Sequence, residues 1–361
     1  MVDETCMPPP TCGIRIEYRK QTSLQVLPDI KQLLMSALWH CDWGEEVANR
    51  IFKWRYCDLD EGETMLAYDG NRPVAMIASY ARPYVMDHEI VRIREASDWF
   101  CLPEYRHLGL GPRLMYNLMN EPEPLLAIGG TEEAQAVLRA LNWRRLPDVR
   151  SYLLPLSTRW LVSKLGRWLR LPIPGSAGFR EPSRRLWPLL RPGRSRGQSW
   201  QHLALSATLP TITPLAAAYD LMPLIRQHEV QWLHAAPKEM GTFFCLVFPE
   251  NTGPAGFSIG RLFFGSNLKY ARLIHIQTST PSVEVYARML AETIRYACDQ
   301  GADVAQLRAS CPLLRRALKQ FGFIWSVSTP SYWWAKNGRS RGDKFHLTFL
   351  RGDDGIVPYP P

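Results

Sequence analysis

Residues 97–112 constrain the fold of this chain more than any other stretch. An apolar, aromatic run from Trp99 to Leu102 has strand character and leads into a short basic loop that contains Gly109 and Gly111. Beyond the loop, apolar residues recur at helical spacing at Leu114, Met115, Leu118 and Met119. A strand, a glycine loop and a helix in this order aim backbone N–H groups and the positive end of a helix dipole at one point. Such a point binds phosphate well, because unpaired amides and the dipole both favour an anion.

The loop has the spacing Arg-x-x-Gly-x-Gly, which begins at Arg106 and follows the strand end Leu-Pro-Glu-Tyr. Glycine at both positions lets backbone and ligand approach closely, and the arginine adds positive charge. This loop resembles the coenzyme A pyrophosphate loop of the GNAT acetyltransferase superfamily. The usual dinucleotide fingerprint has a third glycine, so a Rossmann fold is a poor interpretation. Taken alone, the loop is also compatible with an ordinary strand-to-helix turn.

The order of the expected elements around the loop supports this resemblance. Over residues 13–156 we expect a strand, two helices, three antiparallel strands, the helix after the loop, a strand, a helix and a final strand at 151–156. That order matches the GNAT fold element by element. The sequence therefore predicts an α/β (α+β) fold with a mixed sheet, in which a GNAT domain at 13–156 follows a flexible tail at 1–12.

Landmarks of the first half recur in the second half at constant spacing. In each half a tryptophan precedes an apolar strand by 11 residues and a proline by 49: Trp54, Met65 and Pro103, then Trp232, Phe243 and Pro281. We therefore expect two tandem GNAT-like domains, the second a degenerate copy over residues 201–361. A coincidence of spacing is the alternative.

The expected second domain has no phosphate loop. The corresponding stretch, 279–285, contains no glycine, so side chains would screen its backbone amides. We expect a helix over 214–228 and a longer helix with Thr280 as its N-cap and Gly301 just past its end. One cofactor site, in the N-terminal domain, follows from this asymmetry.

The resemblance implies where coenzyme A binds. In the family, the pantetheine arm pairs with the strand before the loop, and the loop amides hold the diphosphate. Carried over, the cofactor-binding residues are Phe100, Cys101, Leu102, Arg106, His107, Leu108, Gly109, Leu110 and Gly111. Pro112 departs from the pattern because it lacks an N–H, although proline suits the start of a helix. Acetyl-CoA is the expected co-substrate, and no metal is expected because no cluster has metal-ligand spacing.

Direct transfer from a thioester needs a base, donors for the oxyanion and an acid for the leaving thiolate. We expect Asp98 as the base, with Glu95 next, because both lie on the strand that faces the thioester in the GNAT fold. The alternative is that Asp98 caps a turn or pairs with an arginine such as Arg94. Many GNAT enzymes use a tyrosine acid on the last helix; here that position is Leu138, and Tyr152 is the expected substitute.

The net charge of +9 resides in one segment, residues 157–200. It carries ten basic residues and one acid, so the rest of the chain is neutral. Apolar and basic residues separate onto two faces of an expected helix at 159–171, which favours contact with an anionic membrane surface. A plain interdomain connector is the alternative. RNA binding is open but not favoured, because charge without interleaved motifs says little.

The cysteines and the apolar runs indicate a compartment. Eight scattered cysteines without a Cys-x-x-Cys pair indicate reduced thiols rather than disulfides. No apolar run reaches the ~18 residues of a membrane span, and the N-terminus lacks the features of a signal peptide. We expect a cytoplasmic protein, at the inner face of the membrane if the connector binds lipid.

These expectations converge on a tandem GNAT acyltransferase that moves an acetyl group from coenzyme A to an amine or hydroxyl. A bulky acceptor, such as a saccharide precursor of envelope polysaccharide, suits the long chain and the basic connector. The alternatives are a Fem-type aminoacyl transferase that uses aminoacyl-tRNA, and a non-catalytic scaffold that kept the fold. The intact loop favours coenzyme A over tRNA, whereas the missing tyrosine favours the scaffold. The acceptor, the acyl chain and the oligomeric state are left open.

Overall fold

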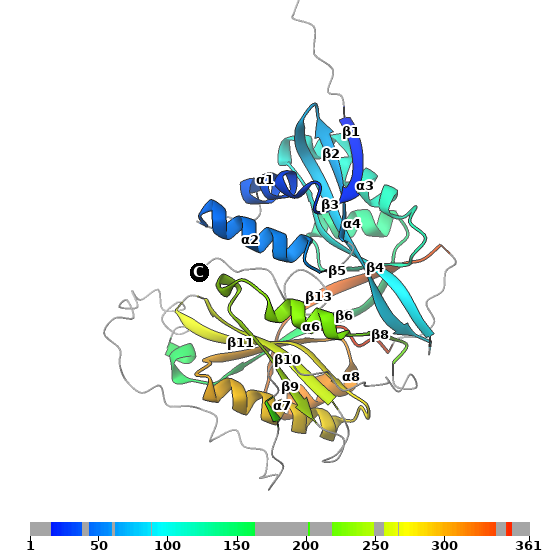
Figure 1. The fold of residues 1–361 in the computed structure, drawn as a ribbon. Coiled ribbons are helices and arrows are strands. Elements are labelled where there is room, and N and C mark those ends of the chain that lie inside the picture. Colours follow the sequence, from blue (N-terminus) through cyan, green and yellow to red (C-terminus); the bar gives the residue numbers. More distant parts are fainter. Residues whose placement is uncertain are drawn as a thin grey trace, which may run out of the picture.

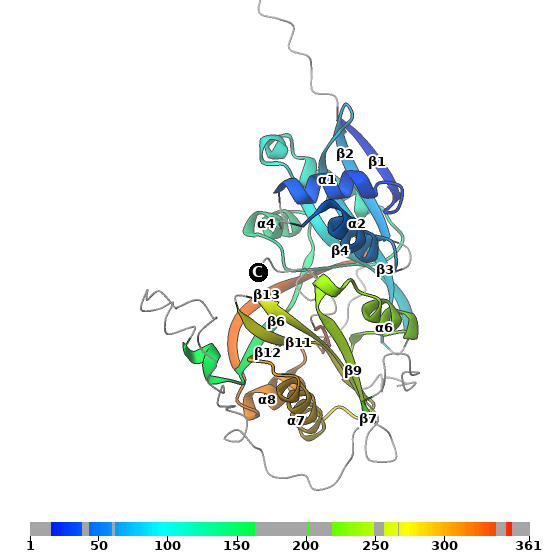
Figure 2. The same ribbon diagram turned by 60° about the vertical axis from the view of Figure 1, so that its left-hand side comes forward.

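The structure is a computed structural model, and it describes residues 16–37, 43–59, 62–87, 89–162, 201–202, 219–248, 256–265, 267–336 and 344–348. The expected tail at 1–12 and most of the basic connector lie outside these residues. One mixed sheet runs through the described part of the chain in the strand order β1-β2-β3-β4-β5-β13-β6-β12-β11-β10-β9-β7. Helices lie on both of its faces, as Figures 1 and 2 show. The predicted α/β class with a mixed sheet is confirmed.

The first half of the chain follows the expected order of elements. It comprises β1 (Ile16–Thr22), α1 (Leu27–Ala37), α2 (Glu45–Tyr56), β2 (Gly62–Asp69), β3 (Arg72–Met86), β4 (Glu89–Cys101), the 3-10 helix η1 (Pro103–Leu108), α3 (Leu110–Leu118), β5 (Leu125–Ile128), α4 (Glu132–Ala140) and β6 (Arg144–Pro155). Strands β1 to β4 are antiparallel, and β4 pairs with β5 in parallel. The final strand is longer than expected, because β6 begins at Arg144 rather than at 151.

The second half repeats this order with some differences from expectation. It comprises β7 (Gln201–His202), β8 (Leu221–Pro223), α6 (Gln227–His234), the 3-10 helix η3 (Lys238–Met240), β9 (Thr242–Phe248), β10 (Gly256–Gly265), β11 (Leu268–Thr278), α7 (Val283–Asp299), β12 (Val304–Ala309), α8 (Pro312–Gln320) and β13 (Ile324–Trp334). The expected helix at 214–228 is wrong over residues 219–226, because β8 pairs there with β3; residues 227 and 228 begin α6. The N-cap of α7 is Ser282 rather than Thr280.

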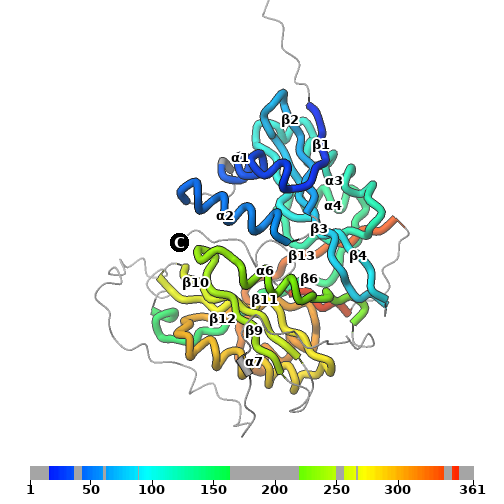
Figure 3. Tube along the Cα trace, in the orientation of Figure 1, coloured from blue at the N-terminus to red at the C-terminus, as the bar shows by residue number. Residues whose placement is uncertain are grey.

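The strand order is symmetric about the central pair of β13 and β6. Outward from this pair, β5 and β12, β4 and β11, β3 and β10, and β2 and β9 occupy matching places. The final strands are exchanged between the halves: β6 pairs with β12, and β13 pairs with β5. The exchange can be traced in Figure 3, where the green β6 and the orange β13 run side by side between the two halves. The two repeats therefore share one continuous sheet.

Two tryptophans make a reciprocal contact between the halves. The rings of Trp54 and Trp232 stack with centroids 4.5 Å apart and planes 9° apart. Trp54 Nε1 donates to the carbonyl oxygen of Trp232 at 2.9 Å, and Trp232 Nε1 donates to that of Trp54 at 2.7 Å. A contact in which each partner does the same thing to the other is typical of two-fold symmetry. The residues whose spacing predicted the repeat are thus its symmetric contact.

Apolar side chains fill both halves and the space between them. The first cluster fills the first half and continues into the second half through residues such as Trp232, Phe243 and Ile259. The second cluster fills the rest of the second half together with the end of β6. A third, smaller cluster also joins the halves, through Tyr84, Ile93, Leu126, Leu146, Val149, Leu221, Trp333, Phe345 and Leu347. Burying one large apolar side chain contributes about 1.5–3 kcal/mol. The first and third clusters therefore both hold the two halves together, the third beside the first-half strands β3 and β4.

Candidate functional site

The loop between β4 and α3 is a left-handed turn followed at once by a helix N-terminus. Gly109 has φ 66°, ends η1 and forms the N-cap of α3. A Cβ atom at Gly109 would meet no other atom within 4 Å, so there is space for a side chain. The positive φ, however, is a conformation that residues with a side chain rarely adopt. No side chain caps α3. The N–H groups of Leu110 and Gly111 have no acceptor within the helix, because they belong to its first turn.

Two side chains support this loop from β4 and η1. Trp99 Nε1 donates to the carbonyl oxygen of Gly111 at 3.2 Å, so the indole ties the first turn of α3 to β4. Arg106 is exposed, and its Nε donates to the carbonyl oxygen of Cys101 at 3.4 Å. Pro112 lies in the first turn, where its missing N–H removes no helix bond. An anion at this helix end would meet free amides, the helix dipole and a nearby guanidinium.

The strands β4 and β5 separate just before the loop. They pair only over Arg94–Ala96 and Leu125–Ala127, while β4 continues against β3 as far as Cys101. We call the space beyond Ala96 the first gap. Ser97 and Cys101 are partly exposed on its β4 side, as is Ile128 on its β5 side.

A β-bulge lies at the start of the first gap. The register between β3 and β4 shifts between Met76 and Ala78, and Asp98 has φ 46° at this point. A bulge leaves one peptide out of the ladder and turns its N–H or C=O elsewhere. The positive φ of a non-glycine residue costs energy, which is a feature of functional sites. The bulge thus takes the backbone at Asp98 out of the regular ladder beside the gap.

The nine expected cofactor residues form one continuous strip along the first gap and the loop. Phe100 and Leu102 are buried, so only their backbone groups could reach a ligand. Residues 106–108 are exposed in η1, and residues 109–111 begin α3. This placement is compatible with a pantetheine arm along β4 and a diphosphate at the helix end.

Asp98 is held by two side chains of α2. Its Oδ2 lies 2.8 Å from Arg55 Nη2 and accepts a hydrogen bond from the Tyr56 hydroxyl at 2.6 Å. The ion pair is buried, with side chains 2% and 5% exposed. Burial, and next the charge of Asp98, raise the pKa of Tyr56 well above its ordinary value. To act as a base, Asp98 would have to leave this pair. The expected arginine partner is present, but it is Arg55 and not Arg94.

Glu95 has a similar environment on the neighbouring part of the sheet. It accepts a hydrogen bond from the Tyr84 hydroxyl at 2.6 Å and lies 3.5 Å from Arg82 Nη1. All three side chains are buried. Each candidate base is therefore matched with one arginine and one tyrosine. The sequence analysis missed these four partners. The alternation of Tyr80, Arg82 and Tyr84 along β3 was the one available signal that polar side chains share a face.

Tyr152 is not brought together with Asp98 and Glu95. It lies on β6, and in the sheet β5 and β13 separate that strand from β4, a distance of roughly 14 Å at the usual strand spacing. Its side chain is buried in the second-half core, where its hydroxyl accepts from Arg315 Nε at 3.2 Å. The reason is the strand exchange, which carries β6 across to β12.

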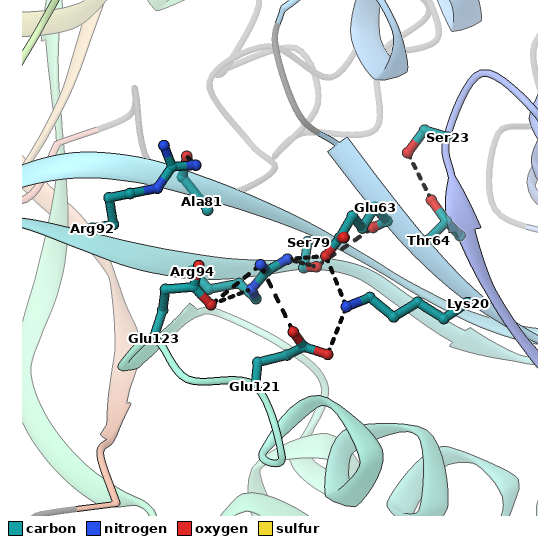
Figure 4. Close-up of polar contacts among 10 residues, drawn as sticks. All are labelled: Lys20, Ser23, Glu63, Thr64, Ser79, Ala81, Arg92, Arg94, Glu121 and Glu123. Carbon is teal, nitrogen blue, oxygen red and sulfur yellow. Dashed lines mark hydrogen bonds and ion pairs between the residues drawn. The ribbon is translucent and has the colours of Figure 1, made fainter.

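Arg94 belongs to a charged network on the other face of β4, shown in Figure 4. It contacts Glu63, lies 3.2 Å from Glu123 and donates to Ser79 at 3.2 Å. Lys20 joins the network through Glu63 and Glu121, which complete a set of three acids around two cations. The network ties β1, β2 and β4 to the loop after α3. Because it holds the segment that follows helix α3, we interpret it as structural support.

Other kinds of site were sought in the same residues. Within the described part of the chain, no group of three or more metal ligands lies together. The cysteines described there form no disulfide, and Cys245, Cys298 and Cys311 are buried. Burial raises the pKa of the Cys245 thiol to about 12, so this thiol is unreactive. No helix in the described ranges has the length and apolar character to cross a membrane.

Comparisons with known proteins agree with this geometry. The model of the acetyltransferase (GNAT) family matches residues 32–123, which include the loop and the β4 side of the first gap. No curated protein sequence gives a significant match.

Several solved structures share the fold at low sequence identity. N-myristoyltransferase of Saccharomyces cerevisiae with bound myristoyl-CoA is 12% identical, with a TM-score of 0.55 over 98% of this chain and 91% of that chain. A probable N-acyltransferase of Enterococcus faecalis is 8% identical, with a TM-score of 0.58 over 88% and 72% of the two chains. A GCN5-related N-acetyltransferase of Anabaena variabilis is 11% identical, with a TM-score of 0.52 over 88% and 72%.

Proposed function

We propose that this chain is an acyltransferase that transfers an acetyl group from coenzyme A to an amine or hydroxyl, and the match of residues 32–123 to the acetyltransferase (GNAT) family model supports this. The observation that carries the proposal is the junction of the first gap with the uncapped N-terminus of α3. A long, thin thioester with a diphosphate at one end fits a strand gap that ends at an anion site. The myristoyl-CoA bound to the similar yeast structure supports a coenzyme A thioester as donor.

In this proposal the two ends of the site bind different parts of the donor. The N–H groups of Leu110 and Gly111, with the guanidinium of Arg106, hold the diphosphate. The edge of β4 over residues 97–101 pairs with the pantetheine arm. The thioester then lies beside the bulge at Asp98, where a backbone N–H can stabilise the developing oxyanion.

Proton transfer is assigned to the two buried carboxylates of β4. Glu95 and Asp98 are the proposed bases, and each can accept the acceptor's proton once its tyrosine or arginine partner yields to the substrate. Both ion pairs are buried, and Glu95 is the stronger candidate because its arginine contact is 3.5 Å long whereas that of Asp98 is 2.8 Å. Tyr152 is the less supported acid, since its hydroxyl lies in the second-half core.

The proposed acceptor and location rest on the charge of the basic segment. We propose a saccharide or other bulky acceptor, with the basic segment 157–200 in contact with an anionic membrane at its cytoplasmic face. The charge of that segment supports this part of the proposal. Aminoacyl-tRNA as donor and a non-catalytic scaffold are the rival functions, and both predict no turnover of acetyl-CoA.

The test is release of free coenzyme A thiol from acetyl-CoA in the presence of a panel of amines, amino sugars and sugar nucleotides. We expect acceptor-dependent release with the wild-type chain. In Glu95→Gln, kcat should fall by about 10²–10⁴-fold with unchanged coenzyme A affinity, because a general base contributes that much. Glu89→Gln, at the exposed start of the same strand, is the matched control and should keep full activity. No release with any acceptor, or full activity of Glu95→Gln, would contradict the assignment.

A further inference from the structure

The second half has a strand gap in the place that matches the first gap. Strands β11 and β12 pair only over Tyr270–Leu273 and Val304–Leu307, while β11 continues against β10 as far as Thr278. We call the space beyond Leu273 the second gap. Its β11 side differs from the first gap in one respect: every residue from His275 to Thr278 is buried, at 3% exposure or less.

Residues 344–348 bridge the second gap. On the β12 side, the N–H of Ser310 donates to the carbonyl oxygen of Leu347 at 3.1 Å, and the N–H of Leu347 donates to Ser310 Oγ at 2.8 Å. Ser310 Oγ in turn donates to the carbonyl oxygen of Phe345 at 2.6 Å. One serine, directly after the end of β12, therefore makes three hydrogen bonds to the segment.

The β11 side of the second gap is held by side chains of the same segment. His346 Nε2 lies 2.7 Å from the carbonyl oxygen of Ile276, and because a carbonyl only accepts, this nitrogen carries the proton. Thr348 Oγ1 lies 3.0 Å from His275 Nδ1. Residues 344–348 thus form hydrogen bonds to both the β12 side and the β11 side of the gap.

The segment alternates between the two halves of the molecule. Phe345 and Leu347 belong to the cluster that contains Tyr84 and Leu126 of the first half. His346 faces the other way, with its ring 5.0 Å from that of Tyr219, and Thr348 shares this side. Successive side chains of an extended chain point to opposite sides, so this pattern is that of a strand.

A neighbouring strand fixes the register of the segment. The N–H of His346 donates to the carbonyl oxygen of Leu221 at 2.9 Å, and the carbonyl of Lys344 accepts from the N–H of Asp220 at 2.8 Å. Asp220 Oδ2 also accepts from the N–H of Lys344 at 2.8 Å. Because β8 itself pairs with β3, the segment is tied through backbone bonds to the first half as well.

We propose that the second gap is a groove for extended polypeptide, and that its occupant is residues 344–348 of the same chain. The groove supplies what a peptide needs: a serine that both donates and accepts, a strand carbonyl that accepts from outside the sheet, and a wall of aromatic rings. It lacks what a diphosphate needs, because α7 starts without a glycine loop and its N-terminus is capped by its own Ser282. The first gap is therefore the cofactor position, and the second gap is a peptide position.

Hydrogen–deuterium exchange of the full chain, read by mass spectrometry with and without coenzyme A, tests this inference. In the wild type we expect residues 274–278 and 344–348 to exchange at least about 100-fold more slowly than free peptide without any ligand. Coenzyme A should leave them unchanged. In low urea the two stretches should open together, as one cooperative unit.

The variant Ser310→Ala removes the side-chain bonds to the segment and should speed exchange of both stretches by at least tenfold while 97–101 is unaffected. Ser326→Ala, which removes one exposed serine bond on β13, is the matched control and should change neither stretch. Free exchange of 344–348 in the wild type, separate opening of the two stretches, or protection of 274–278 by coenzyme A would overturn the inference. The wild-type experiment keeps it testable if the variant fails to fold. A missing response at 97–111 would count against the proposed function alone.

Discussion

The two strand gaps of this molecule have matching backbone geometry and different contents. In each, a strand pairs in parallel with its neighbour for three or four residues and then separates beside a bulge. The first gap keeps Ser97, Trp99 and Cys101 partly exposed, whereas the second is buried around His346. The two halves therefore share a strand order, while the described residues along their gaps differ in how far they are buried.

The helix that follows each gap shows the same divergence on a smaller scale. Helix α3 begins at a left-handed glycine with no side-chain cap, but α7 begins at Ser282, whose hydroxyl accepts from the N–H of Val285 at 3.1 Å. A capping hydroxyl occupies the position that an anion would take. A phosphate site thus needs a helix end that the chain itself leaves unsatisfied.

The largest expected effect comes from closing the first helix end. Gly109→Glu introduces a strained side chain and a negative charge at the proposed diphosphate site, so coenzyme A binding should become undetectable by calorimetry. Gly70→Glu is the matched control, because Gly70 has φ 60° and equally open surroundings in the β2–β3 turn. Equal affinities of the two variants would remove the loop from the account.

The next effect concerns the buried ion pair of Arg55 and Asp98, which has no counterpart beside Trp232 in the second half. Arg55 follows Trp54, whereas the residue after Trp232 is the buried Leu233. Arg55→Leu leaves Asp98 buried without its cation, and the free energy of unfolding in urea should fall by about 3–5 kcal/mol. Arg50→Leu, which breaks exposed ion pairs on the same helix, should cost below about 1 kcal/mol. Similar losses for both variants would contradict a buried pair.

A pH dependence should distinguish the second gap. Burial lowers the pKa of His346 to about 4, below its ordinary 6.5, so the folded state favours the neutral ring. Its contribution to stability is complete above pH 6.5 and is lost as the pH falls toward 4, by at most about 3 kcal/mol. The ring faces Tyr219, Tyr286 and His275, and no carboxylate is described in contact with it.

The free energy of unfolding in urea is measured at pH 7 and pH 4.5 for the wild type and for His346→Gln. The glutamine keeps a donor for the carbonyl oxygen of Ile276 but has no group that titrates in this range. The wild type should lose more stability on acidification than the variant does. Parallel losses in the two proteins would show that His346 is not a neutral, buried ring.

The smallest effect is expected at the second helix end. Ser282→Ala removes the cap of α7 and should cost about 1 kcal/mol of unfolding free energy, with coenzyme A affinity unchanged. Calorimetric binding and urea unfolding of one preparation measure both. A weaker affinity for coenzyme A would indicate that the second helix end takes part in cofactor binding.

Much of the fold could be predicted from local patterns. Helical and strand periodicity gave the order of elements, and the spacing of Trp54 and Trp232 indicated the repeat. The exchange of β6 and β13 could not be predicted, because strand partners far apart in sequence leave no local signal. That exchange is why Tyr152 lies in the other half.

The candidate site divides in the same way. The glycine loop was visible because its residue types and spacing are local. The pairing of Asp98 with Arg55 depends on how α2 crosses β4, so the sequence could suggest an arginine partner but not which one. The burial of His346 depends on Tyr219, His275 and Tyr286, which lie far from it in the sequence.

A crystal structure of the full chain with coenzyme A tests the central claim most directly. The account predicts one cofactor per chain, with its diphosphate on the amides of Leu110 and Gly111, its pantetheine along residues 97–101, and residues 344–348 still in the second gap. Cofactor density in the second gap, or a first gap that stays empty at saturating coenzyme A, would contradict it.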